Sequence, residues 1–186
     1  MSTLIIVYSI LRRPKMLTAK GKYSLKALAH LAAQELGATA QASEIAAASN
    51  IPKKFLDAIL GELRNAGIVH SRKGPGGGYM LARAPSEIKL GRVIRVIDGP
   101  LAPIACASRT AFQPCRDCRD VTACAVRQMM TTVRDAISDV LDRVTLADLQ
   151  ALDGRGRLAT RRLGQKRRNV SRRKMAAFKL AASLRA

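Results

Sequence analysis

Four cysteines are the residues of this chain whose type and spacing could do chemistry, and all of them lie in one short stretch. They are Cys106, Cys115, Cys118 and Cys124. The four thiols are too few and too tightly clustered to form the disulfide framework of a secreted scaffold. Thiolates are soft ligands for iron–sulfur clusters and zinc, so we expect the stretch to wrap one metal centre with these four residues as ligands.

Three kinds of site compete for these cysteines. A structural zinc site usually has two Cys-x-x-Cys pairs, and here only Cys115 and Cys118 form one. The same pair could be a metal-free thiol–disulfide switch, although the βαβ setting of a thioredoxin-like site is absent from the sequence. We therefore expect an iron–sulfur cluster, [2Fe–2S] or [4Fe–4S], with zinc and a thiol switch as the alternatives. Nearby arginines should favour the thiolate form and offset the charge of a cluster; they are Arg109, Arg116, Arg119 and Arg127.

The cysteines precede the longest predicted helix, which spans residues 122–144. Its apolar residues are spaced 4, 3, 4, 3 and 4 apart, a heptad pattern typical of a helix–helix seam. These residues are Val126, Met130, Val133, Ile137, Val140 and Val144. We expect a homodimer built on this helix, the alternative being that it packs against other helices of the same chain. Residues 145–149 predict a short helix that returns to the body of the chain.

Residues 43–82 have the pattern of a helix-turn-helix followed by a β-hairpin wing, an element that enters a DNA groove. Ser43 is expected to cap the first helix, and Pro52 suits the first turn of the second, which should end at residues 66–67. The apolar stripe of that second helix consists of Phe55, Leu56, Ile59, Leu60 and Leu63. Two strands, 68–71 and 78–81, should flank a cationic, glycine-rich tip.

Basic residues at helix starts are candidates for contact with DNA. Lys20 and Lys22 begin a predicted supporting helix over residues 18–36, where the helix dipole favours a phosphate; a solvated basic helix end is the alternative. Lys53 and Lys54 begin the second helix of the helix-turn-helix and should approach the major groove. Asp57, one turn later, could accept a hydrogen bond from a cytosine amine or be an ordinary exposed acid.

The charge of the chain also points to a polyanion. It has 33 Lys or Arg against 13 Asp or Glu, a formal net charge of +20. Residues 155–186 hold twelve of the basic residues and no acid, which leaves +8 for the first 154. Arg72 and Lys73, at the tip of the wing, should reach the minor groove or its phosphates. The basic tail should add salt-sensitive affinity that is independent of DNA sequence.

Residues 16–152 resemble the Rrf2 family of winged-helix transcriptional regulators, which includes IscR-like and NsrR-like iron–sulfur sensors. The resemblance is carried by residues 17–23, 67–69 and 74–82, the last with its glycine–tyrosine pattern, and by the cysteines. It implies a mainly α fold (α+β) with a small β-hairpin wing, a winged helix-turn-helix, a long dimerisation helix and an operator of double-stranded DNA. It also implies three cysteine ligands, which Cys106, Cys118 and Cys124 match.

The chain departs from the family pattern around these ligands. Arg127 stands where IscR-like members have a histidine, and Lys22 stands where NsrR-like members offer an aspartate. The gap after Cys106 is longer than in the family pattern, and Cys115 is an additional thiol. Cys115 is therefore the candidate for a fourth ligand.

The expected organisation has five parts. Residues 1–15 are a non-native or disordered extension, 16–100 the winged helix-turn-helix domain, 101–121 the cysteine-rich sensing loop, 122–153 the dimerisation helix with its return helix, and 154–186 a disordered basic tail. The apolar run near the N-terminus is too short to cross a membrane, and no secretory leader is recognisable, so the protein is expected in the cytoplasm.

These features predict a dimeric DNA-binding regulator, a repressor that senses iron, redox state or nitric oxide through its cluster. The alternative is a zinc-containing or metal-free basic protein that binds nucleic acid with little sequence preference, or a regulator that uses a thiol switch. An enzyme is not expected, because the sequence offers no recognisable nucleophile–base pair or paired carboxylates.

Overall fold

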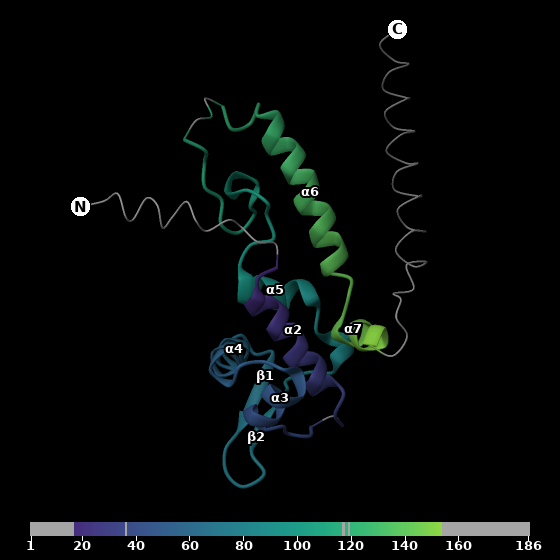
Figure 1. The fold of residues 1–186 in the computed structure, drawn as a ribbon. Helices are drawn as coiled ribbons and strands as arrows, with labels where there is room; N and C mark the ends of the chain where they lie inside the picture. The colour runs from purple at the N-terminus through teal and green to yellow at the C-terminus, as the bar shows by residue number, and fades with distance from the viewer. Residues whose placement is uncertain (1–16, 36, 117, 119, 154–186) are drawn as a thin grey trace, which may run out of the picture. The chain divides into compact units, whose positions relative to one another are not determined.

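The computed structural model of the protein describes residues 17–35, 37–116, 118 and 120–153 (Figure 1). The described residues up to Gln150 belong to one compact unit. The expectations for residues 1–15 and for the basic tail lie outside the described residues. The elements are α2 (Ala19–Ala32), α3 (Ala42–Ser49), α4 (Lys53–Asn65), β1 (Val69–Arg72), β2 (Gly78–Leu81), η1 (Pro85–Glu87), α5 (Leu90–Asp98), η2 (Ala105–Ala107), α6 (Ala125–Leu141) and α7 (Leu146–Asp153). The predicted class, mainly α with a hairpin wing, is confirmed.

Helix α2 is fixed at its start by Thr18, which directly precedes it, and by Asp98 of α5. The Thr18 hydroxyl accepts a hydrogen bond from the Gly21 amide at 3.1 Å, which caps the helix. The carboxylate of Asp98, the last residue of α5, accepts from the Thr18 amide at 2.9 Å. At its other end α2 stops at Ala32, before the predicted end at residue 36. The start of α2 is therefore tied to the end of α5.

The helix-turn-helix begins two residues earlier than predicted. Gln41, and not Ser43, occupies the cap position of α3, and the Glu44 carboxylate accepts from the Gln41 amide at 3.4 Å. Asn50 adopts a left-handed conformation that ends α3, and α4 follows directly after Pro52. At the end of α4, the Arg92 guanidinium of α5 donates to the Ala66 carbonyl at 2.8 Å.

Most residues of the apolar stripe of α4 are buried in the core. Leu56, Ile59, Leu60 and Leu63 are completely buried, in a core that also contains Leu28, Ile45, Val93 and Leu146. Phe55 is 58% exposed, so its prediction as part of that stripe is wrong. At about 100° of rotation per residue, Phe55 lies a quarter turn away from the centre of the buried stripe.

The wing is an antiparallel pair, β1 with β2, in which Val69 lies opposite Leu81 and Arg72 opposite Gly78. Arg72 is thus the last residue of a strand and not part of the tip. Ala40, between α2 and α3, extends the sheet, because its amide donates to the Tyr79 carbonyl at 3.0 Å and its carbonyl accepts from the Tyr79 amide at 2.8 Å. The Thr39 hydroxyl donates to the Gly76 carbonyl at 2.8 Å. Both contacts hold the wing to the helix-turn-helix.

Helix α6 is three residues shorter at each end than predicted, and none of its residues is buried. Val144 lies beyond its end and packs partly against the core, so Val144 is not part of an exposed seam. The following helix, α7, returns as predicted, with Leu146 fully buried. No helix in the described part of the chain is long and apolar enough to cross a membrane.

Candidate nucleic-acid interface and cysteine loop

The start of α4 presents one uncompensated lysine and one lysine in an ion pair. Lys53 Nζ lies 2.9 Å from Asp57 Oδ2, and both side chains are largely exposed. This pair is the usual i, i+4 arrangement on a helix surface, and it partly neutralises both predicted contact residues. Lys54 is exposed and has no ion pair among the described residues. Lys54 is therefore the cation that α4 offers most directly to a polyanion.

The two lysines at the start of α2 differ in the same way. Lys20 Nζ contacts both carboxylate oxygens of Glu62, at 2.5 and 2.6 Å, and so joins α2 to α4. Lys22 is exposed. The ion pair gives Lys20 a structural role between the two helices, whereas Lys22 remains accessible to a phosphate.

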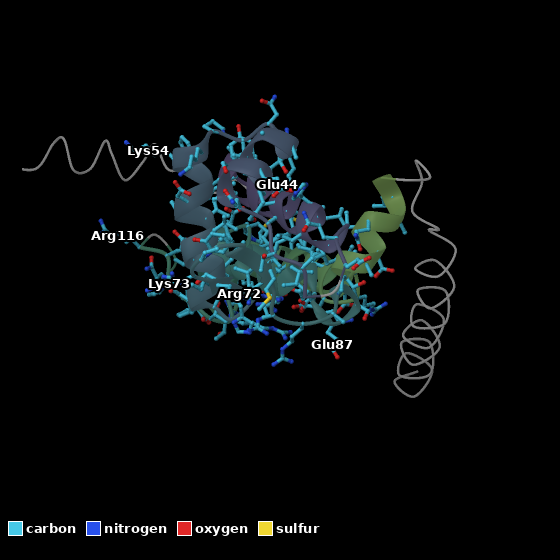
Figure 2. All side chains as sticks on the ribbon, turned by 90° about the horizontal axis from the view of Figure 1, so that it is seen from below. Glu44, Lys54, Arg72, Lys73, Glu87 and Arg116 are labelled. Atoms are coloured by element: carbon cyan, nitrogen blue, oxygen red, sulfur yellow. The ribbon has the colours of Figure 1, made fainter. Side chains whose placement is uncertain are left out.

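The wing supplies the other predicted cations. Figure 2 shows Arg72 and Lys73 on the wing and Lys54 on α4, with their side chains at the surface. Arg72 and Lys73 are both exposed. The interface candidates that keep accessible charge are thus Lys22, Lys54, Arg72 and Lys73.

The cysteines lie at the two ends and in the middle of the loop that joins η2 to α6. Cys106 belongs to η2 and is only 3% exposed, and Cys124 occupies the cap position of α6. The Cys118 and Cys124 sulfur atoms are 3.9 Å apart. None of the four cysteines, all of which the structure describes, forms a disulfide.

The thiol of Cys106 lies near two of the other thiols. The thiol of Cys115 hydrogen-bonds with that of Cys106 and, together with burial, raises the pKa of Cys106; the nearby Cys124 adds to the effect. In the described residues no three His, Cys, Asp or Glu side chains are gathered closely enough to hold a metal ion. Cys106 thus lies near Cys115 and Cys124, and Cys124 in turn lies near Cys118.

The arginines near the loop bind backbone and carboxylate groups. Arg127 Nε donates to the Cys106 carbonyl at 2.9 Å, and its guanidinium lies over the Phe112 ring, 5.9 Å from the ring centre. Arg109 pairs with Asp135 at 3.0 Å. At Cys106 the expectation that arginines favour the thiolate is wrong, because its pKa is raised. Arg116 is exposed, and Arg119 lies outside the described residues.

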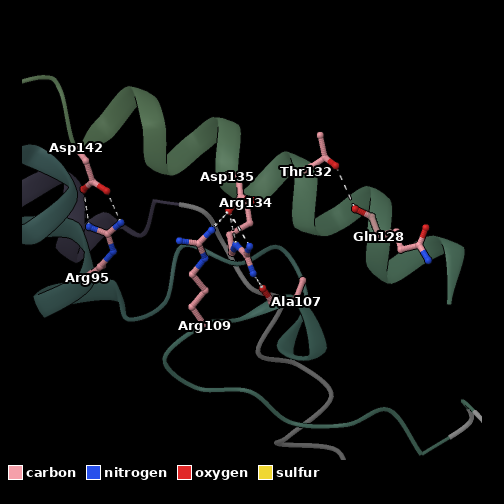
Figure 3. Close-up of polar contacts among 8 residues, drawn as sticks. All are labelled: Arg95, Ala107, Arg109, Gln128, Thr132, Arg134, Asp135 and Asp142. Atoms are coloured by element: carbon pink, nitrogen blue, oxygen red, sulfur yellow. Dashed lines mark hydrogen bonds and ion pairs between the residues drawn. The ribbon is translucent and has the colours of Figure 1, made fainter. Parts of the chain in front are cut away.

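Arg134 and Asp135 attach the loop to α6, and neither was predicted from the sequence. Arg134, with a side chain only 11% exposed, donates to the Ala107 carbonyl and also binds Asp135 at 2.7 Å (Figure 3). Arg134 follows Arg127 by seven residues, which places both on the same face of α6. That spacing was the signal in the sequence. Together the two arginines hold η2 against α6.

The donor chemistry of the loop fits an iron–sulfur cluster. All four donors are soft thiols in one segment, and in the described part of residues 108–124 no helix or strand fixes the distances between them. Arg127 cannot replace a histidine ligand, because a guanidinium stays protonated and has no lone pair to offer. The residues available to hold a cluster are the four cysteines.

At the other end of α6, a second set of contacts leads to the winged domain. Arg95 of α5 binds Asp142 through two hydrogen bonds of 2.6 and 2.8 Å (Figure 3). The Leu90 amide donates to the Val144 carbonyl at 3.0 Å, and the Leu146 amide to the Ile88 carbonyl at 2.9 Å. The single helix α6 thus joins the cysteine loop to α5, which packs on α2 and α4.

Comparison with known proteins agrees with this architecture. The family model described as Rrf2, iron-dependent transcriptional regulator, matches residues 17–152. A rrf2-like HTH-type transcriptional regulator of Rhodobacter capsulatus is 45% identical over 139 residues, which are 73% of this chain and 93% of the relative. The HTH-type transcriptional regulator IscR of Vibrio atlanticus is 31% identical over 133 residues, 72% of this chain and 73% of IscR. Among solved structures, CymR of Bacillus subtilis, titled its global cysteine regulator, has a TM-score of 0.60 and 32% identity, and the match covers 73% of this chain and 95% of CymR.

Proposed function

This chain belongs to the Rrf2 family of transcriptional regulators, and from that premise we propose that it is a cytoplasmic, homodimeric repressor that senses iron, redox state or nitric oxide through a cysteine-ligated iron–sulfur cluster. The observation that carries the proposal is the position of the four thiols. They lie on a loop anchored to α6, and α6 is bonded at its other end to the winged domain.

The DNA-binding part of the proposal rests on the accessible cations. Lys54 lies in the first turn of α4, the proposed recognition helix, and the N-terminal residues of such a helix are the ones that reach base edges in helix-turn-helix proteins. Arg72 and Lys73 would bind the minor groove or its phosphates, and Lys22 a phosphate near the start of α2. A dimer would present two such units to a pseudo-palindromic operator.

The dimer would form on α6. Its apolar residues remain exposed, with Val126 at 59%, Met129 at 56% and Val140 at 41%. A contiguous apolar stripe on a helix favours burial against a partner, and a second copy offers the same stripe in a self-complementary way.

Cys106, Cys118 and Cys124 would hold the cluster, with Cys115 as the fourth ligand. When bound, the cluster would supply a centre that exchanges electrons and reacts with oxidants or nitric oxide. The thiols themselves must lose their protons to ligate, and Arg127 and Arg134 keep η2 in place against α6 while the loop rearranges.

A rearrangement of the loop would reach the recognition helices through α6. Its hydrogen bonds to η2 at one end and to α5 at the other make α6 the continuous connection. A coupling of about 1–3 kcal/mol between loop and DNA would change operator affinity about 5- to 150-fold.

Anaerobic purification tests this function. We expect a brown protein with iron and acid-labile sulfide, and loss of both in Cys118→Ala and Cys124→Ala. Operator affinity should respond to oxidant in the wild type and not in Cys118→Ala. A colourless, iron-free protein, or an unchanged response in Cys118→Ala, would contradict the cluster mechanism and leave the DNA-binding role standing.

A thiol switch is the second candidate, favoured by the 3.9 Å separation of the Cys118 and Cys124 sulfur atoms. In that case the disulfide would join Cys118 to Cys124, and not the Cys-x-x-Cys pair. Peroxide would accept the two electrons and two protons of the thiols and leave as water. Peptide mass mapping after oxidation of metal-free protein identifies the pair.

A further inference from the structure

The outer face of α4 carries a large apolar side chain that core packing does not explain. Phe55 is 58% exposed, whereas its neighbour Leu56 is completely buried. Single exposed apolar side chains are common on protein surfaces, so exposure alone means little. The surroundings of Phe55 decide whether it has a role.

Those surroundings are one cation and two small residues. Lys54 precedes Phe55 and is exposed, and Ala58, one turn further along, is exposed and small. Gly61 follows one turn later, and a Cβ built there would meet no atom within 4 Å. Beyond its first turn, α4 therefore offers little that would keep a duplex away from the Phe55 ring.

We propose that Phe55 recognises a thymine in the operator through contact of its ring with the thymine C5-methyl group. The inference rests on the proposed DNA-binding function. The methyl group is the apolar feature of the major-groove edge, and apolar side chains, Phe included, are its typical partners. Phe55 lies in the first turn of the recognition helix, which is the part that contacts base edges.

Three charged side chains near Phe55 are already paired with other residues. Lys53 and Asp57 are engaged with each other at 2.9 Å. Glu62 is held by Lys20. Lys54 can bind a phosphate or a guanine and so hold the helix in the groove. Phe55 then adds discrimination between thymine and the other bases.

The test compares thymine with uracil, which differs only by the methyl group. Duplexes would be selected from a random pool with the full-length protein, and each thymine of the selected site replaced in turn by uracil. For the wild type, one thymine in each half-site should stand out, with affinity lowered about fourfold on loss of its methyl group. In Phe55→Ala the ratio of the two affinities should fall to about one, and in Phe55→Leu it should be largely retained.

Phe112→Ala is the matched control, because Phe112 is also exposed, at 49%, but lies in the cysteine loop. Its thymine-to-uracil ratio should equal that of the wild type, whatever happens to overall affinity. Site-specific binding in which no thymine methyl matters, or in which Phe55→Ala keeps the wild-type ratio, would overturn this inference alone. A pool that yields no preferred sequence would overturn the proposed function as well.

Discussion

Gly61 lies inside α4 with open space where a side chain would project. A glycine inside a helix is less favourable than alanine by about 0.8–1 kcal/mol. We expect Gly61→Ala to raise the free energy of unfolding by about that amount, measured by urea denaturation of the full chain at fixed protein concentration. A loss of stability would mean that Gly61 has a neighbour which the fold does not reveal.

Gly78 provides the opposite case. A Cβ at this position would collide with the carbonyl oxygen and carbon of Ala40, the residue that extends the wing sheet. Gly78→Ala should therefore lower the free energy of unfolding by roughly 1–3 kcal/mol, as overpacking does. The same denaturation experiment measures this loss of stability. Equal stabilities for Gly61→Ala and Gly78→Ala would refute at least one of the two arguments.

Single residues were the least predictable from sequence. The apolar period of α4 includes Phe55 as readily as Leu56, and only the packing of α4 on the core separates the two. Lys20 and Glu62 lie far apart in the chain, so no local pattern indicates their ion pair. The pairing of Cys118 with Cys124 likewise depends on the path of the loop, whereas spacing alone favoured Cys115 with Cys118.

At the scale of elements, Arg95 and Asp142 join α5 to the end of α6. Hydrogen bonding to Arg95 lowers the pKa of Asp142, so the pair stabilises the folded chain above the usual carboxyl pKa. That stabilisation is lost as the pH falls through the lowered pKa. Because both side chains are more than a third exposed, its size should be below about 1 kcal/mol.

We therefore expect Asp142→Asn to be less stable than the wild type at pH 6 and to approach it near pH 2.5, as followed by urea denaturation. Asp139→Asn is the control, because Asp139 pairs at 3.5 Å with Arg143, two residues beyond the end of α6, and this pair does not link α6 to another helix. A difference between wild type and Asp142→Asn that is constant with pH would contradict the assignment.

The exposed apolar stripe of α6 leads to a prediction about the dimer. Val133 is 39% exposed on this stripe, and a buried, unpaired carboxylate there would be costly. Val133→Glu should convert a dimer to a monomer in analytical ultracentrifugation. Gln128→Glu adds the same charge to the opposite side of α6 and should leave the dimer intact. A wild-type monomer, or a dimeric Val133→Glu, would contradict an interface on this helix.

Elements were largely predictable because periodicity reflects burial directly. The stripe of Leu56, Ile59, Leu60 and Leu63 indicated α4, and the glycine-rich turn between two short apolar runs indicated the wing. Helix ends were less accurate. By residue type Ser43 is a better cap than Gln41, and the helix nevertheless starts after Gln41 because the contact of Ala40 with Tyr79 fixes the chain just before α3.

At the scale of the whole molecule, the net charge of +20 predicts strong salt dependence of DNA binding. Twelve of the basic residues follow residue 154. A chain of residues 1–154 should therefore bind its operator with a shallower dependence of log affinity on log salt, while its preference for operator over random duplex stays. Loss of that preference would favour the alternative of a general nucleic-acid-binding protein in which the tail is the main element.

The two arginine contacts between η2 and α6 also make the cysteine segment a closed ring. Arg127 and Arg134 hold one end of the segment on the same helix that Cys124 begins, so the ends meet before any ligand arrives. Folding has already brought the ends of this loop together, so ligand binding does not have to overcome the entropy of loop closure, which grows slowly with loop length. Loss of the proposed cluster would then free only this ring, and the rest of the chain would keep its structure. If the proposed cluster binds here, the protein should survive repeated cycles of its loss and reloading without unfolding.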